Sequence, residues 1–306
     1  LALYRGAYQI EGLNIWKRTK SPKEPFVSVQ KIDLSLAWRG LFQGKLLGDL
    51  KVDKVKLDLV DSDKKEKKQF GAGEEDWKTI AGKLVPIELE SFKMTRSEVH
   101  LINRDLKVPV DVVLDRIEVQ ASNIKNTDKN KELLPTTIDA SARFQKDAKV
   151  QADAKVNLLA KIPTFQAKAE MKHFDITKLN DFFLGYGPFT FTSGHLSIFS
   201  EISTKQNKIV GYVKPFFEDL DVIGDKEHFD SPKRFFNEIG LAMANFILKN
   251  RKENTVATKI EFEGASSAPN IDKWDAVWTS IHHGFVKALK ENLENTISIK
   301  DVPTKK

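Results

Sequence analysis

The feature that most constrains this chain is hydrophobic alternation with a period of two, which returns along much of its length. Side chains of a β-strand alternate between two faces, so each such run describes a ribbon with one apolar and one polar side. Many such ribbons in series predict a large sheet with one apolar face. The clearest runs are residues 32–38, 108–114, 138–144 and 150–158.

The alternation also changes phase inside single runs. Val27 and Val29 give way to Ile32, and the phase slips again between Val52 and Val55. A slip of one residue inside a continuous strand is typical of a β-bulge, which adds local twist and bend. Repeated bulges predict a strongly curved sheet, a trough in place of a flat layer.

Composition excludes several classes of protein. The 306 residues are 41% hydrophobic and 30% charged, which excludes a disordered chain and a helical integral membrane protein. The longest apolar stretch, 239–248, is too short for a bilayer, which takes roughly 20 apolar residues. The net charge of +6 is spread out, so we expect no nucleic acid partner. There are no cysteines, hence no disulfides.

Helical spacing is found mainly in the second half. It covers residues 175–186, a segment that begins with Ser231 and Pro232, and a last segment with Trp274, Trp278 and Phe285 on one stripe. We therefore expect a mainly β (α+β) fold: a large, strongly curved antiparallel sheet forming a hydrophobic groove, with a few amphipathic helices mostly in the C-terminal half. Residues 1–175 would form the curved sheet and residues 176–306 its continuation with packing helices, as one continuous unit.

The sequence contains no recognisable catalytic apparatus. His282 and His283 are neighbours on an expected helix, where they point about 100° apart and cannot ligate one metal together. No nucleophile elbow, phosphate-binding glycine loop or dinucleotide motif is present. We expect a protein that is not an enzyme, with no metal and no cofactor.

Two segments resemble a known family. GAYQIEGLNI at residues 6–15 and PFVSVQKIDLSLAWRGLFQGKLLGDL at residues 25–50 are similar to the N-terminal pattern of AsmA-like bacterial envelope proteins, in an uncharacterised branch. The pattern recurs at 211–222 and from Asn250 to the last helical segment. The resemblance implies a periplasmic protein tethered to the inner membrane. Because the chain starts at Leu1 in mid-pattern, we expect the tethering helix upstream. It also implies a curved sheet whose groove carries phospholipid between the two membranes.

The residues and the resemblance together predict a groove-type lipid-binding protein, in which the apolar face buries acyl chains. Its partners would be a phospholipid or another acyl-chain lipid, the membrane surface, and envelope proteins. The alternative is a structural or assembly factor for outer-membrane biogenesis without bound lipid, in which the same residues line a closed core. The expected groove residues are Ile32, Leu34, Leu36, Val55, Leu57, Val110, Val112, Ile138, Ala140, Val150, Ala152 and Val156.

Overall fold

The computed structural model describes residues 6–16, 25–37, 46–60, 87–125, 132–157, 164–186, 189–224, 255–265, 285–287 and 290–303. The helical segment expected from Ser231 lies outside these residues. So do Trp274, Trp278 and the pair His282–His283.

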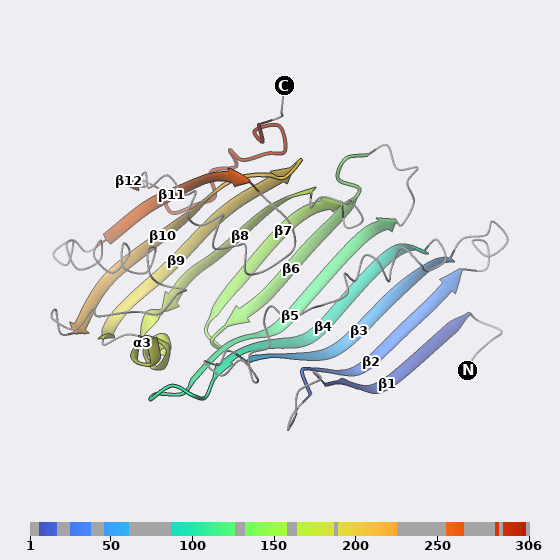
Figure 1. Ribbon diagram of the computed structural model, residues 1–306, viewed down its shortest axis with the longest axis horizontal. Helices are drawn as coiled ribbons and strands as arrows, with labels where there is room; N and C mark the ends of the chain where they lie inside the picture. Colours follow the sequence, from blue (N-terminus) through green and yellow to red (C-terminus); the bar gives the residue numbers. More distant parts are fainter. Residues whose placement is uncertain are drawn as a thin grey trace.

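The described strands form one sheet in which spatial order equals chain order, from β1 to β12 (Figure 1). The sheet is long, curved and unclosed, so the prediction of a mainly β fold built on a large curved sheet is confirmed. All neighbouring pairs are antiparallel except β3 and β4, which are parallel. The strands are β1 Ala7–Ile15, β2 Val27–Ala37, β3 Leu46–Val60, β4 Ile87–Asn103, β5 Val110–Lys125, β6 Thr136–Phe144, β7 Ala148–Asn157, β8 Thr164–Asp175, β9 Phe189–Lys205, β10 Lys208–Gly224, β11 Thr255–Ala265 and β12 Phe285–Lys287.

The parallel pair was not predicted. Parallel neighbours need a long crossover connection, and residues 61–86 between β3 and β4 supply the length. The chain therefore returns to the starting end of β3 before it enters β4. The rest of the sheet follows the antiparallel order that the alternation predicts.

The prediction of several amphipathic helices is wrong for the part of the chain that the structure describes. Its helical elements are a 3-10 turn, η2 (Ile176–Leu179), and one short helix, α3 (Asn180–Tyr186), both within the expected segment 175–186. Asp175 begins η2 as expected of an N-cap, because its carboxylate accepts a hydrogen bond from Thr177 N. Phe285, expected on the last helix, lies in β12, where the backbone pairs with β11.

Phase slips in β1, β3, β4 and β5 coincide with residues at positive φ, whereas the slip in β2 contains none. Gly12 in β1, Lys54 in β3, Arg96 in β4 and Arg116 in β5 have φ between 50° and 67°. The left-handed conformation shifts the side-chain alternation by one residue, which lets the apolar residues stay on one face. Lys54 and Arg96 lie at the same level of their strands, because the paired rows Asp53–Thr95 and Lys56–Glu98 enclose them. The bends of neighbouring strands are therefore aligned, which favours curvature of the whole sheet.

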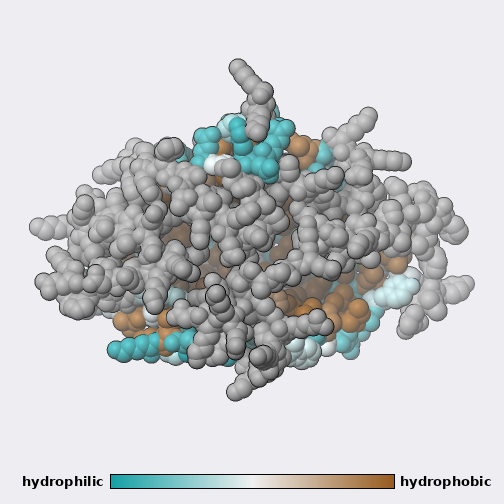
Figure 2. Space-filling view, in the orientation of Figure 1, coloured by the Kyte–Doolittle hydropathy of each residue, from teal (hydrophilic) through white to brown (hydrophobic). Residues whose placement is uncertain are grey.

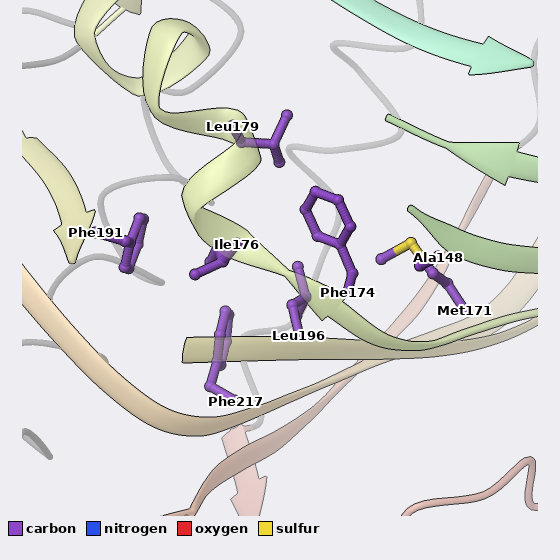
Figure 3. Close-up of a cluster of buried hydrophobic side chains, with 8 residues drawn as sticks. All are labelled: Ala148, Met171, Phe174, Ile176, Leu179, Phe191, Leu196 and Phe217. Atoms are coloured by element: carbon purple, nitrogen blue, oxygen red, sulfur yellow. The ribbon is translucent and has the colours of Figure 1, made fainter. Parts of the chain in front are cut away.

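A cluster of buried hydrophobic side chains lies where η2 packs on the sheet (Figure 3). Ile176 and Leu179 of η2 cover residues from four strands, and Phe174 at its base is fully buried. Phe174 also meets Phe144 edge to face, with ring centroids 4.9 Å apart. The other buried members are Ala148, Met171, Phe191, Leu196 and Phe217.

The close approach of α3 to β5 gives a first testable prediction. A Cβ at Gly185 would lie 2.7 Å from Val110 Cγ2 and 3.0 Å from Val108 O. Gly185→Ala is therefore expected to lower the free energy of unfolding by about 1–3 kcal/mol, the usual range for overpacking, in a urea titration. Leu184→Ala, at the exposed neighbouring position, should change it by less than about 0.5 kcal/mol. Equal effects of the two variants would contradict this packing.

The segment 290–303 docks on the sheet through a buried carboxylate. Glu201 of β9 is 0% exposed and accepts hydrogen bonds from Tyr212 Oη at 2.6 Å and from Thr296 N and Ile297 N at 2.9 Å. Burial acts to raise the pKa of Glu201, but these hydrogen bonds outweigh it and hold the pKa below the usual 4.5. The segment is thus held on the sheet by hydrogen bonds from its backbone N–H groups to the buried carboxylate of Glu201.

A second set of contacts fastens the same segment by ion pairs. The Glu294 carboxylate lies 3.2 Å from Lys214 Nζ and 2.6 Å from Lys259 Nζ. Burial acts to raise the pKa of Glu294, and the two lysines outweigh it and lower that pKa. Lys214 is itself buried, with its ammonium over the ring of Phe199. Its charge is therefore paired and does not stand alone in the interior.

Candidate functional site

The strand register places apolar residues side by side across almost the whole sheet. Directly paired residues of neighbouring strands share a face, so the pairs can be followed from β1 to β11. The first such row is Ile10, Ile32, Val52, Met94, Val119, Ala140, Ala152, Ala169, Ser200, Val213 and Ile260. Only Ser200 is polar in it. The row therefore continues through every strand up to β11.

A second row, displaced by two residues along each strand, is apolar throughout. It is Tyr8, Leu34, Leu50, Phe92, Ala121, Ile138, Ala154, Ala167, Ile202, Gly211 and Phe262. We call the face that carries these two rows the apolar face. In β2 to β8 its row members are all half-buried except Ala121, which is buried. In Figure 2, hydrophobic residues are visible between the grey atoms, most clearly toward the lower right of the side that it presents.

The residues between the two rows are polar in every strand up to β11. They form the row Gln9, Asp33, Lys51, Lys93, Gln120, Asp139, Asp153, Lys168, Glu201, Tyr212 and Glu261. We call this the polar face. The segment 290–303 docks on this face, because Glu201 and Tyr212 belong to the row. The apolar face is therefore on the other side of the sheet from the docked segment.

Ion pairs and neighbouring like charges mark the polar face. Asp53 pairs with Arg96 through two hydrogen bonds, and this contact lowers the pKa of Asp53. Asp139 and Asp153 lie directly opposite each other in β6 and β7. Burial, with the hydrogen bond to Asp139, raises the pKa of Asp153. Charged neighbours and burial account for these pKa shifts, which therefore do not indicate a substrate site.

Small side chains are concentrated in the middle of the apolar face. Ala140, Ala152 and Ala169 are neighbours in one row, and Ala154 and Ala167 are neighbours in the other. Larger side chains lie on both sides of this group, including Met94 and Phe92 toward β1 and Ile202 toward β12. The side chains at the centre of the apolar face are therefore mostly single methyl groups.

The register places five of the predicted groove residues in the two apolar rows. Ile32, Leu34, Ile138, Ala140 and Ala152 are members of the two apolar rows. Three further predicted residues lie two positions from row members on the same strands and share their face by alternation. These are Leu36 in β2 and Val150 and Val156 in β7.

The remaining four predicted residues lie beyond the phase slips. Val55 and Leu57 follow Lys54 in β3 and are half-buried. Val112 is half-buried and packs against the cluster below η2. Val110 is 2% exposed, with Gly185 of α3 directly against it. A bound molecule would meet Val110 only after displacement of α3.

Sequence reasoning missed the contribution of β4 to this face. Phe92 and Met94 stand in the two rows between β3 and β5. The available signal was the alternation of Phe92 and Met94, followed after Arg96 by that of Val99 and Leu101. Because the phase slips between these two short runs, the single strand of 17 residues was not recognised from the sequence.

Neither a metal-binding cluster nor a helix that could span a membrane is found among the described residues. They contain no group of three or more His, Asp or Glu side chains arranged to hold a metal ion. In the same part of the chain, neither η2 nor α3 approaches the length and hydrophobicity that a bilayer span takes.

Fold and surface together define a class: an unclosed, curved, mainly antiparallel sheet with one apolar and one polar face. A scan against protein-family models finds no match to this chain, and a search of curated proteins finds no match either.

Proposed function

We propose that this chain is a non-enzymatic, groove-type lipid-binding protein whose apolar face holds acyl chains. The observation that carries the proposal is the pair of apolar rows that pass through eleven successive strands of a curved sheet. A fold of this size normally covers such a face within its own core, and from β2 to β8 all members of these rows except Ala121 remain half-buried. An acyl chain is a ligand of matching chemistry and shape.

The energetics favour a long apolar ligand. Neighbouring strands are about 4.8 Å apart, so rows across this sheet extend for about 50 Å. Each buried methylene contributes about 0.8 kcal/mol. The small side chains of Ala140, Ala152 and Ala169 would leave room for such a chain, and the bulkier residues on either side would flank it. No directed polar contact is needed for affinity of this kind.

We extend the proposal to phospholipid transport between the inner and outer membranes of a Gram-negative envelope. This step rests on the resemblance of residues 6–15 and 25–50 to AsmA-like proteins. The protein would then act in the periplasm, tethered to the inner membrane. Its partners would be phospholipid, the membrane surface and other envelope proteins.

A structural or assembly role without bound lipid is the second candidate. It is favoured by the exposed outer edge of β1, where Ile10 and Trp16 are each 52% exposed. A sheet edge of this kind serves protein contacts and not acyl chains. In that case the rows would be covered by protein.

Native mass spectrometry after purification without detergent separates the two candidates. For the lipid-binding protein we expect an added mass that organic extraction identifies as phospholipid. The extracted chain should regain it from phospholipid vesicles. A chain that carries no lipid and takes up none from vesicles would contradict lipid binding and support the assembly role.

A further inference from the structure

Strand β1 presents an unusual edge. It pairs with β2 on one side, and no described strand pairs with its other side. Edge strands are commonly protected by lysine or proline, and β1 contains neither. Its large apolar side chains are exposed at Tyr8 (42%), Ile10 (52%), Leu13 (37%) and Ile15 (47%). This edge therefore has the properties of a strand that pairs with a further strand.

The polarity of this edge is the same when it is read in either direction. The centre of the pattern is the bond between Glu11 and Gly12. Counting outward from it, Ile10 matches Leu13, Gln9 matches Asn14, and Tyr8 matches Ile15. Ala7 matches Trp16 at the ends. Such a pattern is self-complementary in an antiparallel pair, because each apolar residue meets an apolar one and each amide meets an amide.

The backbone is compatible with the same pairing. Gly6 O accepts a hydrogen bond from Leu36 N, and Ile15 O accepts one from Phe26 N, so these carbonyls point toward β2. The alternation shifts by one residue at Gly12 (φ 67°). Before this shift, the amides of Ala7, Gln9 and Glu11 point outward, away from β2. After it, the outward groups belong to Gly12, Asn14 and Trp16. These two sets are the ones that the palindromic register brings opposite each other.

We propose that β1 pairs with β1 of a second copy of this chain, antiparallel and about a two-fold axis at the Glu11–Gly12 bond. Glu11 then faces Gly12 of the second copy, which keeps the two glutamates from being directly opposed. Ile10 faces Leu13 and Tyr8 faces Ile15, so the apolar faces of the two sheets join. The bends at Gly12 coincide, and one sheet runs through both copies. The pairing is independent of the proposed lipid binding.

Sedimentation of the full chain tests the assembly, and cysteine pairing tests the register. We expect twice the mass of one chain. Because the sequence has no cysteine, Ile10→Cys and Leu13→Cys each introduce one thiol. A directly opposed pair has Cα atoms about 4.5 Å apart, within disulfide range. Two Ile10 positions would be about 10 Å apart, beyond that range. A mixture of the two variants should therefore cross-link under mild oxidation, and each variant by itself should not.

A proline variant separates the edge from the fold. Gln9→Pro removes an outward N–H and leaves the bonds to β2 in place, so it should give a folded monomer. Gln9→Ala retains the N–H and should remain a dimer. The proposal is overturned by a monomeric unmodified chain, by cross-linking of Ile10→Cys alone as efficient as that of the mixture, or by a Gln9→Pro dimer.

Discussion

Replacing Ala152 with aspartate is expected to weaken phospholipid binding about tenfold or more while the chain still folds. Ala152 is half-buried at the centre of the apolar face, between Ala140 and Ala169. With no lipid present, a carboxylate there stays hydrated. An acyl chain that covers it imposes the cost of desolvation, which amounts to several kcal/mol for an unpaired charge. Binding of a fluorescent phospholipid, with a melting curve beside it, measures both quantities.

Thr137→Asp is the matched control for Ala152→Asp. Thr137 is exposed on β6, the neighbouring strand, and is paired with Lys155 on the polar side of the sheet. The same charge there should leave lipid binding unchanged. Val112 is a poorer test position, because its packing below η2 means that a charge would disturb folding. Equal binding by both aspartate variants would place the lipid elsewhere, and an unfolded Ala152→Asp chain would indicate a closed core.

Glu201→Ala is expected to release the segment 290–303 from the sheet. The substitution removes the acceptor of Tyr212 Oη and of three consecutive backbone N–H groups, from Asn295 to Ile297. Donors left without an acceptor cost about 1–3 kcal/mol each when they stay buried, so the segment opens instead. We expect its opening to become easier by about 2–4 kcal/mol, or roughly 30- to 700-fold in hydrogen-exchange protection of those amides. Glu263→Ala, at an exposed position of β11, should leave the protection unchanged.

The docking of this segment should also depend on pH in the acidic range. The folded-state pKa of Glu201 is lowered from 4.5, so its contribution is fully present above that value. It is lost as the pH falls below 4.5 through the lowered pKa, and Glu294 acts in the same direction. Exchange protection of the Thr296 amide should therefore fall on acidification. Protection that is independent of pH between 7 and about 3 would contradict the role of the two carboxylates.

Strand content could be predicted from the sequence because a half-exposed sheet leaves its signature in every strand. Each strand keeps one apolar side, as in Ile138, Ala140 and Ala142 of β6, and the bulges appear as visible slips of that pattern. Lys54 and Arg96 carry no local signal for positive φ, since such conformations are unusual for residues other than glycine. A phase slip indicates a bulge, but a single sequence does not display which of its residues takes the positive φ.

Helices and strand order were harder to predict for different reasons. The spacing around Phe285 fits a helix, but β11 offers a backbone edge and tertiary pairing overrides local propensity. The apolar face could be predicted in β6, in β7 and in the part of β2 after its phase slip, where the alternation is unbroken. It could not be assembled across β4, because the parallel register of β3 and β4 depends on a crossover and not on the alternation. The docking role of the buried Glu201 could not be predicted, since the backbone groups that it binds lie nearly a hundred residues further along the chain.

The sequential strand order has a consequence for how the molecule gains and loses structure. Each strand that the structure describes pairs only with its neighbours in strand order, so the sheet behaves as a one-dimensional array of adjacent contacts. Ordering can begin at any hairpin, for example β6–β7, and spread outward in both directions, whereas the docking of residues 290–303 on Glu201 joins parts of the chain that are far apart in sequence. Loss of structure proceeds from the two ends inward. The length of such a sheet can therefore change in evolution by the gain or loss of whole hairpins. Each such change leaves the remaining strands in register.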